Sequence, residues 1–311
     1  MNEREEQKLR DERVYLERMA KTFLDKAFFL KDLPETVDRI VDFGCADGSF
    51  LQFIDRVMPN RYKLLGVDMN PKFMKLCEKK GYMVLKDLKH VVKMLPEAER
   101  AKTCVVLSSV LHEVLSYDND WRKPEFHELL ALLKDSGFGC VAIRDMSCIM
   151  KEQPAAELKE VLLNEQAVQA AIARLEDKLL LRGGQISFPD NTTAALRLMN
   201  SKFRCHLIEP HEELFHFLLK YFYTENWDRE SREQYFWEQN SLAQMRRCFS
   251  EHDGWKMYVG ETFKIPYLVR KWRADFDFDG DPDFEEVLRL CDTHYRALFV
   301  NEKAVSKIKA T

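Results

Sequence analysis

The most constraining feature of the sequence is a regular alternation of short β-forming runs and helical segments between residues 39 and 145. Five strands are expected in this part of the chain, at 39–43, 62–67, 82–85, 103–107 and 137–143. Strands that alternate with helices indicate βαβ units, whose right-handed crossovers build a parallel sheet. The sequence therefore predicts an α/β fold.

The alternation stops near residue 149, and a long stretch with helical patterning follows. A helix predicted at 228–249 then precedes two strand-like runs, 255–264 and 295–300. We expect these two runs to complete the first sheet, so that the whole chain forms a single catalytic domain. Its expected parts are an N-terminal helical segment (1–30), a core (31–149), a helical insertion or lid (150–230) and the completion of the sheet (231–311).

The composition is that of a globular protein with ample core material. The chain has 311 residues, 46% of them hydrophobic, and a formal net charge of −4, which does not indicate a nucleic-acid binder. Its eight cysteines form no CxxC pair, so buried free thiols are expected. With no visible signal peptide and no apolar run of membrane-spanning length, a reducing, cytoplasmic setting is the expectation.

One loop of the core carries an unusual density of small residues. A predicted strand ends near Asp42, the loop Gly44-Cys45-Ala46-Asp47-Gly48 follows, and Ser49 is placed to cap the next helix. A strand, a small-residue loop and a helix N-terminus present backbone N–H groups to a ligand beyond the strand ends. The residues alone leave two alternatives, a site for a nucleotide-like cofactor and an ordinary glycine-bearing turn.

The spacing of this loop resembles the first motif of the class I S-adenosylmethionine-dependent methyltransferases. That motif reads acid-x-Gly-x-(Gly/Ala)-x-Gly, and Asp42 to Gly48 matches it, whereas the G-x-G-x-x-G spacing of NAD-binding folds is absent. Two further acids, Asp68 and Asp87, follow the second and third strands in the order typical of this family. The resemblance covers roughly residues 36–147 and, with less specificity, the final strand pair.

The resemblance implies a Rossmann-like, mostly parallel sheet with a terminal antiparallel strand pair and helices on both faces. It implies S-adenosyl-L-methionine as cofactor and S-adenosyl-L-homocysteine as product, with Asp68 accepting hydrogen bonds from the ribose hydroxyls and Asp87 near the adenine amino group. A carboxylate suits two vicinal hydroxyls because it accepts from both. The expected cofactor-binding residues are Asp42, Gly44, Cys45, Ala46, Asp47, Gly48, Asp68, Met69, Asp87, Ser108 and Ser109.

The end of the fourth strand is where this fold places the transferred methyl group. His112 is our candidate general base there, and the alternative is a histidine that only packs near the cofactor. Glu113 either orients His112 or forms an ion pair elsewhere. The segment lacks the Pro-Pro-aromatic motif of base-amine methyltransferases and the Pro-Cys of cytosine-C5 enzymes. Asp145, after strand five, either contacts substrate or pairs with Arg144 or a helix terminus.

Two further groups of residues are candidates for ligand contacts. In the insertion, Tyr223 and Trp227, with Tyr235 just beyond it, either form an apolar wall around the acceptor or pack on the sheet. The acidic loop that carries Asp275, Asp277, Asp279 and Glu286 satisfies the EF-hand expression, although Pro282 interrupts the pattern. A solvated acidic loop is the favoured reading, and a calcium site is the alternative.

The sequence thus favours methyl transfer to a small-molecule or metabolite acceptor, with no membrane partner. An RNA or tRNA methyltransferase is the first alternative, because several basic residues are candidates for a phosphate-binding stripe. They are Arg246, Arg247, Lys256, Arg270, Lys271 and Arg273. A non-catalytic S-adenosylmethionine-binding or scaffold protein is the second alternative. The motifs name the methyl donor and leave the acceptor and the oligomeric state undefined.

Overall fold

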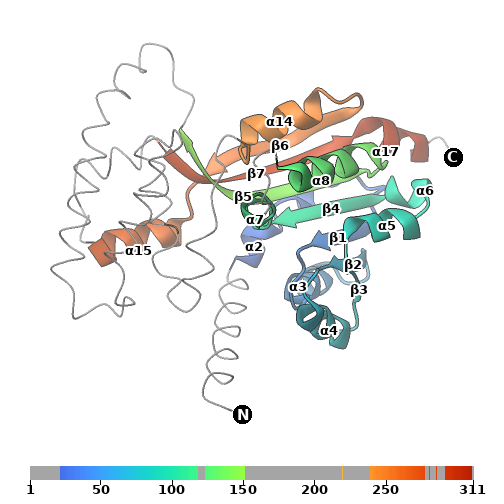
Figure 1. Cartoon of the computed structure of the whole chain (residues 1–311), viewed down its shortest axis with the longest axis horizontal. Coiled ribbons are helices and arrows are strands. Elements are labelled where there is room, and N and C mark those ends of the chain that lie inside the picture. Colours follow the sequence, from blue (N-terminus) through green and yellow to red (C-terminus); the bar gives the residue numbers. More distant parts are fainter. Residues whose placement is uncertain are drawn as a thin grey trace. The chain divides into compact units, whose positions relative to one another are not determined.

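The described part of the chain contains a seven-stranded sheet (Figure 1). The computed structural model describes residues 22–117, 123–150, 239–276 and 291–309, together with 219, 280 and 285. The strands lie in the order β3-β2-β1-β4-β5-β7-β6. Their bounds are β1 Arg39–Phe43, β2 Lys63–Val67, β3 Met83–Leu85, β4 Thr103–Ser108, β5 Cys140–Met150, β6 Trp255–Phe263 and β7 Cys291–Asn301.

The first five strands are parallel, and the last pair is not. β1 pairs in parallel with both β2 and β4, β2 with β3, and β4 with β5. The start of β6 lies beside the end of β7, because the Glu302 N–H donates to the carbonyl of Gly254. At the opposite ends of the same two strands, the Thr262 hydroxyl donates to Asp292 at 2.6 Å. β6 and β7 are therefore antiparallel, and the expected Rossmann-like sheet with a terminal antiparallel pair is confirmed.

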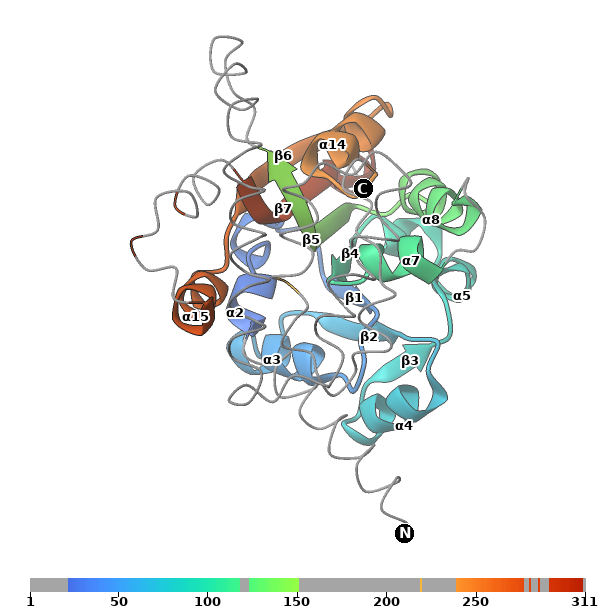
Figure 2. The ribbon, with the colours of Figure 1, turned by 60° about the vertical axis from the view of Figure 1, so that its left-hand side comes forward.

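Helices flank the sheet (Figure 2). They are α2 Phe23–Lys26, the short 3-10 helix η1 Leu30–Asp32, α3 Ser49–Val57, α4 Pro71–Lys79, α5 Leu88–Met94, α6 Glu97–Arg100, α7 Leu111–Tyr117, α8 Pro124–Asp135, α14 Leu242–Ser250 and α17 Glu302–Lys309. A further helix, α15 Pro266–Phe276, belongs to the second of the two units described below. Most of the expected helical insertion (150–230) lies outside the described residues.

Two helix starts show how local sequence sets the elements around the loop. Asn70 caps α4 by accepting from the Lys72 N–H at 3.0 Å, with Pro71 in the first turn, as expected. The prediction that Ser49 caps α3 is wrong. Gly48 occupies the cap position with φ of 76°, and Ser49 is the first helical residue, whose hydroxyl donates to Asp47 at 2.7 Å. A left-handed backbone suits glycine, so the helix begins one residue later than a serine cap requires.

Apolar side chains on one face of the sheet join it to α3. Ile40 of β1, Cys104 and Val106 of β4 and Leu298 and Val300 of β7 pack with Phe50 and Ile54 of α3 in one buried cluster. On β7, Phe299 stacks on Phe249 of α14, with ring centroids 4.4 Å apart. Side chains alternate across a strand, so Phe299 lies on the face opposite its neighbours Leu298 and Val300. Apolar side chains therefore pack on both faces of the sheet. This packing holds the strands whose carboxyl ends carry the site described below.

The chain separates into two compact units. Among the described residues, the first unit holds 22–145, 239–261 and 295–309, and the second holds 146–150, 262–276 and 291–294. In the second unit, the Lys264 ammonium pairs with Asp292 at 2.7 Å, and Phe263 lies against His294 with ring centroids 5.6 Å apart. Within the described residues, no helix is long and apolar enough to cross a membrane. Every residue of the pocket described below belongs to the first unit.

Candidate active site

The loop between β1 and α3 is held against the end of β2 by its own backbone. The N–H groups of Gly44 and Cys45 both donate to the carbonyl of Val67, at 2.8 and 3.0 Å. Three of the five loop residues have a left-handed backbone, with φ of 79° at Gly44, 46° at Ala46 and 76° at Gly48. This conformation explains the small residues of the motif, because larger side chains rarely adopt it.

Asp68 connects this loop to the turn after β2. Its Oδ2 accepts from the Ala46 N–H at 2.9 Å, and its Oδ1 accepts from the Asn70 N–H at 2.8 Å. Asp68 thus stands beside the small-residue loop, where the resemblance puts a ribose-binding acid. Its neighbour Met69 is 80% exposed. Asp87 lies farther along the strand ends as the N-cap of α5, where its Oδ1 accepts from the His90 N–H at 2.9 Å.

Asp47 fixes the far side of the loop. Its carboxylate accepts from the Ser49 hydroxyl at 2.7 Å and from the Lys80 ammonium at 2.5 Å. Burial on its own would raise the pKa of Asp47, but the hydrogen bonds from Lys80 and Ser49 outweigh it and hold the pKa below its ordinary value. The side chain of Asp47 is therefore an ionised anchor of the loop at neutral pH.

Two thiols lie beneath the loop. Cys45 and Cys77 are buried and hydrogen-bond to each other, which together with burial raises the pKa of Cys45 far above its ordinary value. Neighbouring glycines leave room for them. A Cβ on Gly48 would meet the Cys77 sulfur at 2.5 Å, and one on Gly66 would meet the Cys45 sulfur at 2.6 Å. The thiols are thus packing groups under the loop, as the sequence led us to expect of the cysteines.

A pocket of about 370 Å³, part of it open to solvent, lies at the carboxyl ends of β1 and β4. It is lined by Phe23, Lys26, Asp42, Gly44, Cys45, Ala46, Asp47, Ser49, Phe50 and Ser108. Six of the eleven expected cofactor residues line it, namely Asp42, Gly44, Cys45, Ala46, Asp47 and Ser108. The other five, Gly48, Asp68, Met69, Asp87 and Ser109, are not part of its lining.

The floor of this pocket holds a polar atom without a partner. The Ser108 hydroxyl is buried, and no described residue accepts from it or donates to it. Buried polar groups in native proteins are nearly always hydrogen-bonded, so an unmatched hydroxyl in a pocket indicates a ligand group. Ser108 ends β4, immediately beside the end of β1.

Asp42 and Lys26 bring opposite charges into the wall of the pocket. Both are buried, with 4% of each residue exposed. Burial, reinforced by the charge of Asp68, raises the pKa of Asp42 to about 7, although Lys26 opposes the shift. Burial and the charge of Arg144 lower the pKa of Lys26 to about 8, although Asp42 and Asp25 oppose it. Each group is poised to exchange a proton near neutral pH.

Lys26 and Phe23 come from α2, which the sequence analysis did not connect with the site. The available signal was a lysine on an apolar helical stripe, three residues after Phe23 and four before Leu30. Phe23 contacts Phe50 and Phe53 of α3, with ring centroids 5.6 and 5.5 Å apart. α2 thus forms a third wall of the pocket.

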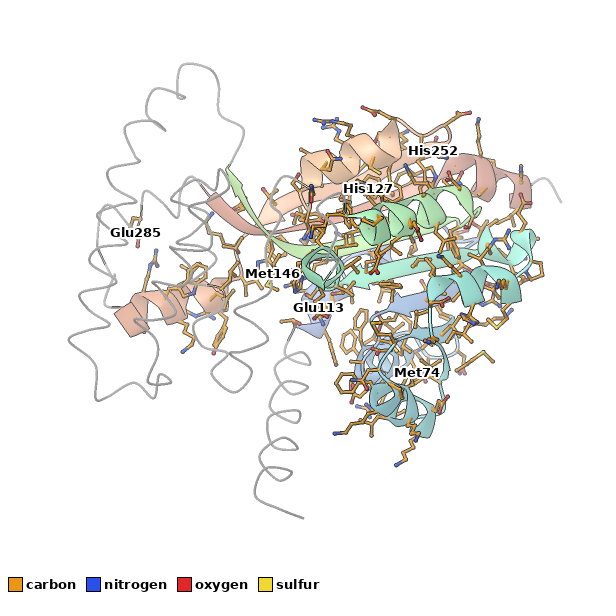
Figure 3. All side chains as sticks on the ribbon, viewed as in Figure 1. Met74, Glu113, His127, Met146, His252 and Glu285 are labelled. Carbon is orange, nitrogen blue, oxygen red and sulfur yellow. The ribbon has the colours of Figure 1, made fainter. Side chains whose placement is uncertain are left out.

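The segment after β4 is anchored by β5. Arg144 donates through Nη1 to the Ser109 hydroxyl at 2.9 Å, and the Ser109 N–H donates to the Arg144 carbonyl at 2.8 Å. These bonds hold Ser109 in a left-handed conformation with φ of 57°. The turn they stabilise leads directly into α7, which carries His112 and Glu113 (Figure 3).

His112 is held at two points by Asp145. The Asp145 Oδ1 lies 2.6 Å from the His112 Nδ1, and the Oδ2 accepts from the His112 N–H at 3.0 Å. An ionised carboxylate only accepts hydrogen bonds, so we assign the ring proton to Nδ1. Asp145 therefore orients the ring. Of the alternatives left open for Asp145, the structure bears out pairing with a helix terminus, and its side chain is fully buried.

Several candidates lie outside the described residues. These are Tyr223, Trp227, Tyr235, Asp277, Asp279 and Glu286, and the side chain of Asp275 is also not described. In the part of the chain that the structure describes, no group of three or more metal-binding side chains is assembled.

Comparisons with known proteins give matches only at the level of three-dimensional structure. No protein-family model matches the chain, and no curated protein matches its sequence. The plantazolicin methyltransferase BamL, in complex with a triazolic desmethylPZN analog and SAH, aligns with 97% of this chain and 91% of its own, at 8% identity and a TM-score of 0.44. A SAM-dependent methyltransferase from Archaeoglobus fulgidus aligns with 89% of this chain and 93% of its own, at 15% identity and a TM-score of 0.42.

Proposed function

We propose that the chain is an S-adenosylmethionine-dependent methyltransferase that acts on a small-molecule or metabolite acceptor. The observation that carries the proposal is the pocket at the ends of β1 and β4, bounded by a left-handed small-residue loop and floored by the unmatched hydroxyl of Ser108.

The residues around the pocket fit the cofactor's chemical groups. Asp68, beside the loop, supplies the carboxylate for a ribose, and Ser108 supplies a hydroxyl that lacks a partner. Lys26 and Asp42 supply two buried ionisable groups in the lining of the pocket. When bound, S-adenosylmethionine supplies an electrophilic methyl group on a sulfonium, so the protein's main contributions are positioning and removal of the acceptor's proton.

His112 is the general base in this proposal. Asp145 holds the ring with Nδ1 protonated, which makes Nε2 the atom that takes the acceptor's proton. Asp145 also stabilises the imidazolium that forms, because the two groups lie 2.6 Å apart in a buried environment. This arrangement supports base catalysis more strongly than the sequence did, since a carboxylate partner for the histidine is in place.

Two measurements test the proposal in order. Calorimetry with S-adenosylhomocysteine asks whether the full chain binds the cofactor product, and absence of binding would refute the cofactor assignment. Incubation with methyl-labelled S-adenosylmethionine and a fractionated cell extract then identifies the acceptor class. We expect label in the metabolite fraction; label in RNA would favour the nucleic-acid alternative, and binding without any transfer would favour a non-catalytic protein.

A further inference from the structure

A buried arginine stands between the wall of the pocket and the turn that leads into α7. Arg144 of β5 is 3% exposed, and arginine is almost never fully buried unless its charge is paired. Its guanidinium carries five donors in a rigid plane, so one side chain can hold acceptors that lie on different sides of it. Arg144 is not part of the pocket lining, so any effect that it has on a ligand there passes through other residues.

Arg144 holds the helix that forms one wall of the pocket. Its Nε donates to the Asp25 Oδ2 at 2.8 Å. Asp25 belongs to α2, as do Phe23 and Lys26, which both line the pocket. Charge-assisted hydrogen bonds of this kind are roughly twice as strong as neutral ones, so the pair contributes directly to the docked position of α2.

The same guanidinium holds the turn after β4. Its Nη1 donates to the hydroxyl of Ser109, whose backbone φ is 57°. A residue other than glycine keeps such a conformation only where its surroundings hold it. Ser109 stands two residues before α7, in which His112 is the second residue. Loss of the bond from Arg144 would therefore release the backbone that leads to His112.

His112 itself is tied to the next residue of the same strand. Asp145 follows Arg144 directly, lies 2.6 Å from the His112 Nδ1 and accepts from the His112 N–H at 3.0 Å. Two adjacent residues of β5 thus hold the pocket wall, the Ser109 turn and the histidine ring. Hydrogen bonds and ion pairs that join rigid elements in this way can carry energetic coupling between two sites.

We propose that Arg144 is a positioning residue that couples the α2 wall of the pocket to the turn that carries His112. This inference rests on the proposed function, which supplies the ligand of the pocket and the role of the histidine. A ligand that packs against α2 stabilises its docked position, and the bonds of Arg144 to Asp25 and Ser109 transmit this stabilisation to the turn. The base is then held most firmly when the methyl donor is bound.

Hydrogen exchange measured by mass spectrometry tests this coupling without an acceptor. In the wild-type chain, saturating S-adenosylhomocysteine should slow amide exchange at 109–117 by at least about fivefold. Asp25→Asn removes the charge with which Arg144 pairs, and the same ligand should then slow exchange at 109–117 by less than about twofold. Asp32→Asn, on the neighbouring η1, is the matched control and should keep the wild-type ratio.

The ratio of exchange rates with and without ligand separates coupling from a purely structural role. A structural role of Asp25 would speed exchange equally in both states, so an unchanged ratio in Asp25→Asn would overturn the inference. Ser109→Ala removes the bond at the other end of Arg144. In this variant the ligand should still protect α2 but no longer 109–117, which decides the question if Asp25→Asn does not fold.

The wild-type chain distinguishes failure of the inference from failure of the proposed function. If it binds S-adenosylhomocysteine without slowing exchange at 109–117, the coupling is refuted and the cofactor assignment stands. If it does not bind S-adenosylhomocysteine at all, the proposed function fails and the inference fails with it.

Discussion

The carboxylate of Asp68 accepts from the backbone N–H of Ala46 at 2.9 Å, across 22 residues of sequence. This bond joins the two loops that carry the first and second acids of the motif. Asp68→Ala leaves the Ala46 and Asn70 N–H groups without their carboxylate partner. We expect a loss of about 1–3 kcal/mol in unfolding free energy and at least a tenfold loss in affinity for S-adenosylhomocysteine.

Urea unfolding and calorimetry measure these two effects separately. Glu78→Ala, an exposed position on α4, serves as the control and should leave both quantities unchanged. Unaltered cofactor affinity in Asp68→Ala would refute the assignment of the ribose to this acid.

The second prediction concerns Gly48 and separates two causes of strain. Gly48 and Gly81 both have positive φ, 76° and 92°, but a Cβ on Gly48 would meet the Cys77 sulfur at 2.5 Å, whereas one on Gly81 would meet nothing within 4 Å. We expect Gly81→Ala to cost about 1 kcal/mol of unfolding free energy and Gly48→Ala to cost roughly 1–3 kcal/mol more.

Chemical denaturation of both variants and of Gly48→Ala/Cys77→Ala tests the contact. Removing the sulfur should recover part of the difference, because the left-handed strain and the approach to the Cys77 backbone at 3.3 Å both remain. Equal destabilisation by the two single substitutions would contradict the role assigned to Cys77.

The third prediction tests His112 and Asp145 as a unit. His112→Gln and Asp145→Asn should each lower the rate of methyl transfer by roughly 10²–10⁴-fold, because the base is lost or its ring is no longer fixed. The double variant should be little worse than either single variant, since both changes remove one function.

Affinity for S-adenosylhomocysteine is the internal control for these variants and should stay within about threefold of the wild type. Unfolding free energy must be measured alongside, because both side chains are buried. Full activity in His112→Gln would leave the histidine with the packing role considered from the sequence.

The fourth prediction is a pH dependence of stability that arises from Asp42. Burial raises its pKa to about 7, whereas its ordinary value is 3.8, so the folded chain retains a proton that the unfolded chain loses. The contribution of Asp42 to the free energy of unfolding is fully present below pH 3.8 and is lost as the pH rises towards 7. Unfolding free energy should therefore fall across this window by at most a few kcal/mol, at about 1.4 kcal/mol per pKa unit.

Asp42→Asn removes the titrating group and should flatten this part of the profile, measured by urea unfolding at a series of pH values without ligand. Asp55→Asn, at an exposed position of α3, should retain the slope of the wild type. An identical profile for Asp42→Asn and the wild type would show that another group causes the pH dependence.

The sequence predicted the features that depend on local backbone chemistry. The loop from Gly44 to Gly48 needs left-handed residues at fixed positions, and the strands are buried hydrophobic runs, so both are visible in a single sequence. The start of α3 was misplaced by one residue because Gly48 adopts a left-handed conformation that the pattern does not distinguish from other loop glycines.

The features that the sequence did not predict depend on pairing between distant elements. Asp145 lies 33 residues from His112, and the adjacent Glu113 offered an equally suitable carboxylate in sequence. In the sequence, Lys26 is one residue of a predicted helical stripe. Its burial depends on the tertiary packing of α2, which the sequence pattern does not reveal. Which carboxylate meets which partner is decided by tertiary packing, and the periodicity of a single chain does not encode it.

The pairing of Asp25 with Arg296 spans 271 residues and has a consequence for biosynthesis. α2 is translated well before β7, which carries Arg296. The ion pair can therefore form only after β7 has emerged, and until then α2 depends on its contacts with Arg144 and with the aromatic rings of α3.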